Sequence, residues 1–147
     1  MKKIFISVAL LTMPLFGAMA QNIVATNEII DCGQVMYQSP ATADFEVVNK
    51  SNKPVRIIDV RTSCGCTSVA YPKDRIEAGD KFMVSVTYDA ETMGHFDKYV
   101  GIYSEGADKP LMLRVRGNVV REMVDYGGNY NFMLGNIKSD CNDVEFD

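Results

Sequence analysis

The stretch Lys81-Phe82-Met83-Val84-Ser85-Val86-Thr87-Tyr88 has the clearest alternation in the chain. Large apolar residues stand at every second position, beginning with Phe82. Because successive side chains of a strand point to opposite faces, this pattern predicts a strand with one buried face. Serine and threonine on the other face indicate that it meets solvent. The chain therefore contains at least one strand of a two-layer β-structure.

Similar short runs lie on both sides of this stretch, with turn residues between them and no helical period of any length. The predicted strands are 23–30, 42–48, 55–60, 67–71, 82–88, 96–104 and 111–119. About seven strands in roughly 100 residues, with turns every 8–12, are typical of an immunoglobulin-like β-sandwich. The chain has no tryptophan, which excludes an antibody-type domain. We predict an all-β, immunoglobulin-like sandwich of about seven antiparallel strands.

The first 20 residues have the pattern of a cleavable signal peptide. Lys2 and Lys3 precede a mostly apolar run, and Ala18-Met19-Ala20 supplies small residues before Gln21. The apolar run is shorter than the ~20 residues that a spanning helix needs, so no transmembrane segment is expected after cleavage. This predicts an exported protein of the bacterial periplasm or cell surface, or a secreted one.

The net charge limits the classes of partner that the chain is expected to bind. Without Lys2 and Lys3, 13 basic residues stand against 19 acidic ones, a net charge of −6. An acidic chain without a basic cluster excludes nucleic acid, which is bound through lysine and arginine. The expected partner is a protein or another cell-envelope component, bound at an exposed sheet edge or an end loop.

The sequence predicts four regions along the chain: a signal peptide at 1–20, the sandwich at 21–119, a connector at 120–135 and a terminal segment at 136–147. The terminal Asn142-Asp143-Val144-Glu145-Phe146-Asp147 partly repeats Asn27-Glu28-Ile29-Ile30-Asp31-Cys32. Two alternatives follow, a terminal strand or the start of a second, truncated repeat.

Several motifs together resemble one bacterial family. They are Val47-Val48-Asn49, Pro54-Val55-Arg56-Ile57, Thr62-Ser63-Cys64-Gly65-Cys66-Thr67, Ile76-Glu77-Ala78-Gly79-Asp80, Val84-Ser85-Val86-Thr87-Tyr88-Asp89, Gly94-His95-Phe96-Asp97-Lys98 and Leu113-Arg114-Val115-Arg116-Gly117. Over about residues 27–119 the chain resembles the domain of unknown function 1573 family, which usually has Pro-Gly in place of Ala78-Gly79. The resemblance implies an exported sandwich related to the ASH and PapD-like groups. It implies no activity, because the family has none established.

Cys64 and Cys66 are the candidate site. In an extended strand, residues two apart project to the same side, and Gly65 allows a kink or a positive φ. Three alternatives remain open: small buried hydrophobes, a short-loop disulfide, or two ligands of a soft-metal site for Cu or Zn. His95 or Met93 would complete such a metal site.

The other two cysteines, Cys32 and Cys141, are possible disulfide partners of each other or of the central pair, or they remain unpaired. Four cysteines allow three full connectivities, among which the sequence does not choose. An exported protein meets an oxidising compartment, where disulfides persist.

Enzyme signatures are missing from the chain: it has no nucleophile elbow, zinc-protease motif, phosphate loop or dinucleotide fingerprint. A Cys–His pair of Cys64 or Cys66 with His95 is formally available, but no lysine or histidine adjoins the cysteines. We predict a non-catalytic exported binding or scaffold module, without a cofactor. The alternative is a Cu- or Zn-binding or redox-sensing domain that uses the Cys64-Gly65-Cys66 pair.

Overall fold

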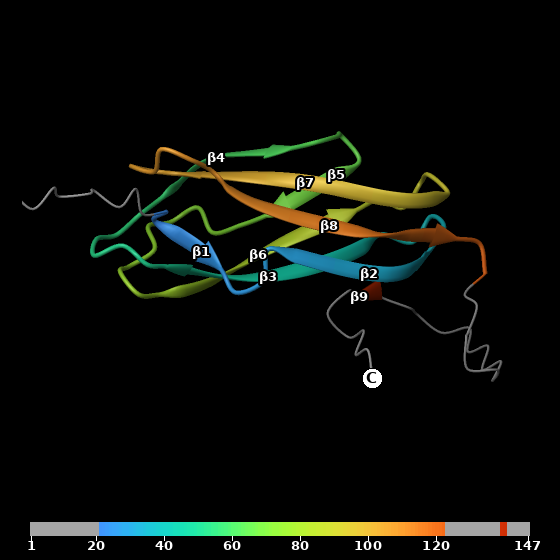
Figure 1. Cartoon of the computed structure of the whole chain (residues 1–147), viewed down its shortest axis with the longest axis horizontal. Helices are drawn as coiled ribbons and strands as arrows, with labels where there is room; N and C mark the ends of the chain where they lie inside the picture. Colours follow the sequence, from blue (N-terminus) through green and yellow to red (C-terminus); the bar gives the residue numbers. More distant parts are fainter. Residues whose placement is uncertain (1–20, 123–138, 141–147) are drawn as a thin grey trace, which may run out of the picture.

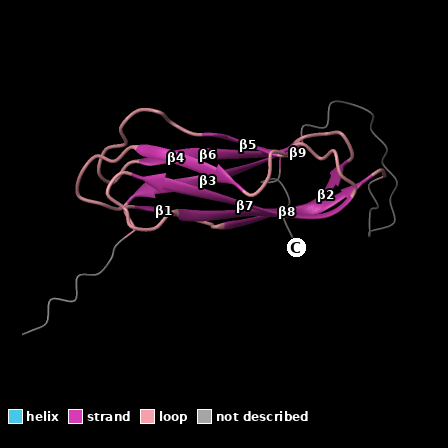
Figure 2. Ribbon diagram, turned by 90° about the horizontal axis from the view of Figure 1, so that it is seen from above, coloured by secondary structure: helices cyan, strands magenta, loops and turns pink. Residues whose placement is uncertain are grey.

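The computed structural model describes residues 21–122 and 139–140, which form nine strands and no helix (Figure 1). The strands are β1 (Ile23–Ala25), β2 (Ile29–Met36), β3 (Ala41–Asn49), β4 (Ile57–Thr62), β5 (Thr67–Ala70), β6 (Lys81–Tyr88), β7 (Gly94–Ser104), β8 (Leu111–Val120) and β9 (Ser139–Asp140). Figure 2 shows strands and loops only. No described segment has the length and apolar character of a membrane-crossing helix.

Two sheets face each other. One has the order β1-β3-β6-β5, with β9 also paired to β3, and the other has the order β2-β8-β7-β4. The alternation of residues 81–88 is realised in β6, where Val84, Val86 and Tyr88 are buried while Lys81 and Met83 are exposed. The prediction of an all-β sandwich is confirmed.

The N-terminal strand differs from the prediction. Instead of one strand over 23–30, β1 joins β3 in one sheet and β2 joins β8 in the other. The chain crosses between the sheets at residues 26–28, fixed by hydrogen bonds from Thr26 N to Glu46 O and from Arg114 N to Glu28 O. Since β2 reaches the free edge of β8 in the same direction, this pair is parallel, and the expected all-antiparallel arrangement is wrong here. Residues 21–122 hold eight strands, one more than predicted.

The terminal segment is described only at β9, which pairs in parallel with the start of β3. The remainder of 136–147 and nearly all of the predicted connector lie outside the described residues, as does the predicted signal peptide.

The core lies between the sheets and is rich in valine. Its largest fully buried side chains include Phe45, Ile102 and Leu113. Phe96 stacks on Tyr88, with ring centroids 4.2 Å apart. A Cβ placed on Gly117 of β8 would lie only 2.7 Å from the Phe96 ring. The glycine therefore makes room for an aromatic residue at this end of the core.

Asn49 is a buried polar centre at the end of β3. Its Nδ2 donates to the carbonyls of Lys53, Ile76 and Glu77 at 3.0, 3.0 and 3.1 Å. Its Oδ1 accepts hydrogen bonds from the N and Oγ of Ser51. Because a buried amide is stable only with its polar atoms paired, this side chain fixes two turns against the strand.

The sheet edges are short or irregular. β1 and β5 contain three and four residues. β2 shifts register between Asp31 and Gln34, where Gly33 has φ +61°, and β4 shifts between Ile57 and Asp59. Ile58, in the second irregularity, is 63% exposed and therefore lies outside the core. Short and bulged edges discourage the addition of another strand.

Candidate functional site

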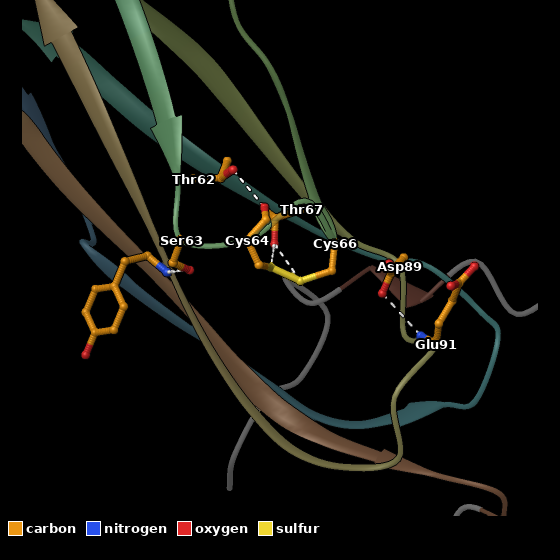
Figure 3. The surroundings of a disulfide bond; sticks show 8 residues. Thr62, Ser63, Cys64, Cys66, Thr67, Asp89 and Glu91 are labelled. Atoms are coloured by element: carbon orange, nitrogen blue, oxygen red, sulfur yellow. Dashed lines mark hydrogen bonds between the residues drawn. A yellow bond between two sulfur atoms is a disulfide. The ribbon is translucent and has the colours of Figure 1, made fainter.

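Residues 62–67, here called the cysteine corner, carry the chain from β4 in one sheet to β5 in the other (Figure 3). Cys64 and Cys66 form a disulfide, with their Cα atoms 5.3 Å apart. Both are half-buried, and Cys66 packs against the core. Of the three alternatives for this pair, the structure contains the short-loop disulfide.

Hydrogen bonds hold the corner on both sides of the disulfide. Ser63 N donates to Tyr99 O at 2.9 Å, and Tyr99 N donates to Ser63 Oγ at 3.1 Å. Thr62 Oγ1 donates to Cys64 O at 2.8 Å, while Asp89 N donates to Cys66 O at 3.1 Å. The corner is thus tied to β7 and to the loop after β6 independently of the sulfur–sulfur bond.

Thr67, the residue after Cys66, places its hydroxyl next to the disulfide. Its Oγ1 lies 3.5 Å from Cys64 Sγ and 3.9 Å from Cys66 Sγ, and the residue is 8% exposed. A hydroxyl in this place can donate a hydrogen bond to either sulfur. The sequence motif contains this threonine, but only the turn geometry shows its contact with both sulfurs.

Gly65 is exposed at the tip of the corner. Its φ lies outside the positive region, so the positive φ that the sequence allowed is not used. Apart from the adjoining Cys64 and Cys66, no residue has an atom within 4 Å of a Cβ built on it. Neither a positive φ nor crowding by described residues beyond the two adjoining cysteines requires glycine at this position.

The candidate metal ligands do not form a cluster. Among the residues that the structure describes, no group of three or more His, Cys, Asp or Glu could hold a metal ion. The Cys64 and Cys66 sulfurs bond to each other, and His95 and Met93 are both exposed. In this state the corner has no thiolate to offer a soft metal.

Cys32 is buried, with 4% exposure, and is disulfide-bonded. Since Cys64 and Cys66 bond to each other, neither of them is its partner. The candidate partner Cys141 lies outside the described residues.

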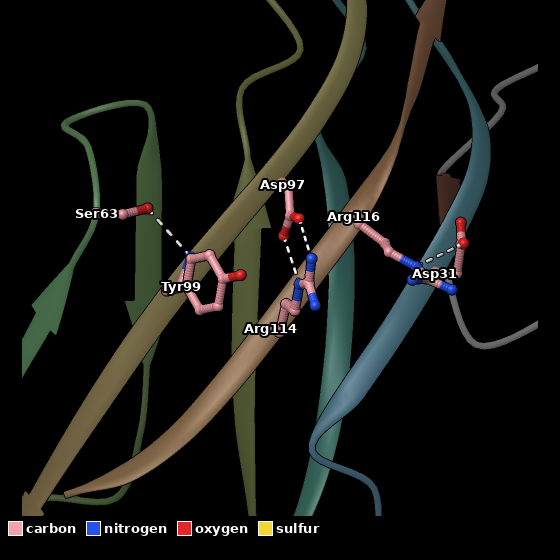
Figure 4. A network of polar contacts seen from close by, with 6 residues as sticks. All are labelled: Asp31, Ser63, Asp97, Tyr99, Arg114 and Arg116. Carbon is pink, nitrogen blue, oxygen red and sulfur yellow. Dashed lines mark hydrogen bonds and ion pairs between the residues drawn. The ribbon is translucent and has the colours of Figure 1, made fainter.

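A second candidate surface is the outer face of the four-stranded sheet, here called the Arg–Tyr face (Figure 4). It consists of Ile29, Asp31, Asp59, Arg61, Asp97, Tyr99, Tyr103, Met112, Arg114 and Arg116. Register sets these side chains in rows across the strands, with Ile29 and Tyr99 on either side of Arg114. In the next row, Asp31 and Asp97 lie on either side of Arg116.

Each arginine of this face has an aspartate partner. Arg114 makes a two-point ion pair with Asp97, Arg116 Nε lies 2.9 Å from Asp31, and Arg61 Nε lies 2.8 Å from Asp59. The hydrogen bond from Arg114 lowers the pKa of Asp97, and the one from Arg61 lowers the pKa of Asp59.

Aromatic rings support two of these guanidinium groups. Arg114 Cζ lies 5.2 Å from the centroid of the Tyr99 ring, and Arg61 Cζ lies 5.0 Å from that of Tyr103. Such cation–π contacts hold the long arginine side chains across the sheet. The result is an ordered face on which every arginine is charged and neutralised.

Between the ion pairs, the Arg–Tyr face is apolar and open. Ile29, Tyr99 and Met112 are 50%, 41% and 47% exposed. Met112 and Tyr103 lie against Gly101, which is buried between them. The predicted strand over 111–119 places Arg114 and Arg116 on one face, because they are two positions apart. It did not reveal their partners, which depend on the register of β8 with β2 and β7.

The outer face of the other sheet differs. Thr42 and Thr87 hydrogen-bond to each other, Ser85 donates to Asp44, and Lys81 pairs with Glu46. These are cross-strand pairs of small or charged side chains, as on a solvent-facing sheet. Met83 is the large hydrophobic residue exposed there, at 50%.

Comparison with solved structures shows the fold. The chain is similar to the ASH/PapD-like domain 7 of human CEP192, with TM-score 0.60, 12% identity, and 81% of this chain and 99% of that one covered. A protein of unknown function from Porphyromonas gingivalis W83 gives TM-score 0.57 and 17% identity over 71% of this chain and 51% of that one. The VesB protease of Vibrio cholerae gives TM-score 0.52 and 15% identity, with 66% and 32% covered. Identities this low establish architecture alone.

Comparison with curated proteins yields no match. The family model described as "Protein of unknown function (DUF1573)" matches residues 23–119, which are most of the chain. Both the predicted family and its ASH/PapD-like fold are confirmed. The chain therefore belongs to the DUF1573 family.

Proposed function

We propose that this protein is a non-catalytic, exported binding or scaffold module of the bacterial cell envelope that docks a partner protein on its Arg–Tyr face. The observation that carries the proposal is the exposure of Ile29, Tyr99 and Met112 between ordered ion pairs on one sheet. Protein interfaces are enriched in tyrosine, methionine and arginine.

The charges of this face favour a protein over a phosphate-rich partner. Each guanidinium already has an aspartate beside it, which leaves little positive potential for a nucleic acid or an anionic membrane. A partner's polar groups can bond to the remaining donors of Arg61 and Arg116, which are more exposed than Arg114. Its apolar groups would pack on Tyr99 and Met112.

Strand addition at a sheet edge, the docking mode that the sequence suggested, is the less favoured mode. Backbone pairing needs a long, regular edge. The edges formed by β1 and β5 are short, and those of β2 and β4 are bulged. We therefore assign recognition to side chains of a sheet face.

Export is part of the proposal. It is supported by the signal-like residues 1–20 and by disulfides at Cys32 and Cys64–Cys66, since such bonds persist in oxidising compartments. The N-terminal residue of protein recovered from the cell envelope tests it. Gln21 is expected, and an uncleaved Met1 contradicts the export step.

The docking surface is tested with a photo-reactive amino acid placed at Met112 and, as the matched control, at Met83. The two methionines are similarly exposed, at 47% and 50%, on opposite faces of the sandwich. We expect a cross-linked protein from position 112 and none from position 83. The cross-linked protein is then purified, and its affinity is measured for Met112→Glu and Met83→Glu.

The proposal requires that Met112→Glu abolish this binding while Met83→Glu leaves it unchanged, with both variants melting like the parent. Equal effects of the two substitutions, or cross-links from position 83 alone, would refute the Arg–Tyr face as the docking surface. A cross-link only to a second copy of the chain would replace the partner by self-assembly.

A further inference from the structure

We propose that the Cys64–Cys66 disulfide is a reactive site that exchanges with the dithiol of a protein or peptide substrate. This goes beyond the docking function and does not depend on it. The redox alternative gains support because the bond is formed, whereas a metal site would need both sulfurs as thiolates.

Access to the bond is the first argument. Both cysteines are half-buried, and Gly65 between them is exposed, with no atom of any residue beyond those two cysteines within 4 Å of its Cβ position. Neither φ nor any residue beyond the two cysteines requires glycine there, and the space outside Gly65 is open to an approaching chain. An incoming chain can reach the sulfurs over Gly65.

The disulfide is also unnecessary for the shape of the corner. Hydrogen bonds from Ser63 to Tyr99 and from Asp89 to Cys66 already anchor both ends. The bond closes a loop of two sequence steps, which restrains the unfolded chain little. It can therefore open without dismantling the sheets, unlike a disulfide that joins distant segments.

Thr67 supplies a group for the leaving sulfur. Cys66 packs against the core, so we assign attack to Cys64 and departure to Cys66. The buried Thr67 hydroxyl, 3.5 Å from Cys64 Sγ and 3.9 Å from Cys66 Sγ, can turn its proton toward the Cys66 thiolate that forms. A hydrogen bond to a charged sulfur stabilises it and speeds exchange.

The proposed exchange oxidises the substrate dithiol in two steps. A substrate thiolate attacks Cys64 Sγ, forms a mixed disulfide and breaks the Cys64–Cys66 bond, leaving Cys66 as a thiolate. The second substrate thiolate then attacks the first substrate sulfur, forms the substrate disulfide and expels Cys64 as a thiolate. The substrate is oxidised to a disulfide, and Cys64 and Cys66 take up its two electrons and two protons.

The surroundings indicate which substrate is favoured. Asp89 and Glu91 lie on the loop beside the disulfide, and Asp89 N contacts Cys66 O (Figure 3). Two carboxylates repel an anionic thiolate and attract basic side chains. The expected substrate is therefore a dithiol flanked by lysine or arginine.

The first test treats the oxidised protein with dithiothreitol and follows each cysteine by alkylation and mass spectrometry. The disulfide of Cys32, whose own side chain is buried, is the internal reference. We expect Cys64–Cys66 to open at least about tenfold faster, since rates follow access to the sulfur. Equal rates, or opening only on unfolding, would overturn the proposal.

The second test separates access from leaving-group support. Gly65→Val should not change the rate at which the disulfide oxidises dithiothreitol. It should slow the oxidation of a basic peptide dithiol about tenfold, because only the peptide needs the space over residue 65. Thr67→Val should slow both about fivefold, and Thr67→Ser should restore the rate by returning the hydroxyl. If Gly65→Val has no effect on the peptide, or Thr67→Ser fails to restore a folded variant, the assigned roles are wrong.

The third test uses single cysteines. In Cys66→Ser the remaining Cys64 should form a mixed disulfide with a basic peptide disulfide faster than Cys66 does in Cys64→Ser. The reverse order would refute Cys64 as the attacked sulfur. A matched acidic peptide should react more slowly than the basic one, and an equal rate would remove Asp89 and Glu91 from the argument.

Discussion

Replacing Gly117 by alanine is expected to destabilise the sandwich more than any comparable glycine change. The added Cβ would lie 2.7 and 2.8 Å from two atoms of the Phe96 ring and 3.0 Å from the carbonyl oxygen of Gly33. Ordinary contact begins at 3.4 Å, so the ring must retreat by 0.7 Å. Phe96 is 3% exposed and stacks on Tyr88, so no free space receives it.

The cost follows from these contacts. Overpacking a tight core costs about 1–3 kcal/mol, and this site is at the upper end because one neighbour is backbone. Alanine is itself more stable than glycine within a strand by about 0.5–1 kcal/mol, which offsets part of this cost. The free energy of unfolding should fall by about 2 kcal/mol, which for a domain of this size lowers Tm by about 8–16 °C.

Gly101→Ala is the matched control, since Gly101 is also buried in the same sheet. Its nearest neighbour is the flexible Met112 side chain, with Sδ 3.4 Å from the built Cβ. Thermal and urea unfolding should show a change within about 0.5 kcal/mol for this variant. Phe96→Leu added to Gly117→Ala should recover part of the loss. Equal stability of the two glycine variants would refute the packing argument.

Three further predictions concern polar and sulfur groups. The double variant Cys64→Ser/Cys66→Ser should lose only about 1.6 kcal/mol in urea unfolding, because the bond closes a loop of about three residues; a loss near that of a long-loop disulfide would contradict this. Asn49→Ala should cost about 3 kcal/mol, because three backbone carbonyls lose their donor, and a loss below about 1 kcal/mol would show that water replaces the amide. The hydrogen bond from Arg114 lowers the pKa of Asp97, so this carboxylate adds stability above its unfolded pKa that is lost as pH falls through the lowered native value. Asp97→Asn should therefore flatten the acid side of the stability–pH curve, and an unchanged curve would show that the pair adds nothing.

Most strands were predictable because one face of each is buried. Alternation located β6 and β8, and turn residues separated them from their neighbours. The division of residues 23–30 between two sheets was not predictable from local pattern. It depends on the free edge of β8, which lies about 80 residues away in the chain and is known only after the fold forms.

The position of the cysteine corner could be predicted from the sequence, but the bonding state of its two cysteines could not. In an extended strand, residues two apart are separated by about 6.7 Å, at the upper limit for a disulfide. The turn brings Cys64 and Cys66 to 5.3 Å, and only that turn makes the bond straightforward. Thr67 and the aspartate partners of the arginines were missed for a related reason, since each contact depends on three-dimensional register.

The irregular edges of this sandwich affect how its choice of binding partner can change by substitution. Recognition through backbone pairing is nearly independent of side chains, so it is slow to alter by substitution. Residues such as Ile29, Tyr99 and Met112 are 41–50% exposed, and substitutions at exposed positions usually change stability little. Under the proposed docking function, the same scaffold can therefore acquire a new partner through a few surface changes, while its bulges discourage the addition of strands from neighbouring copies.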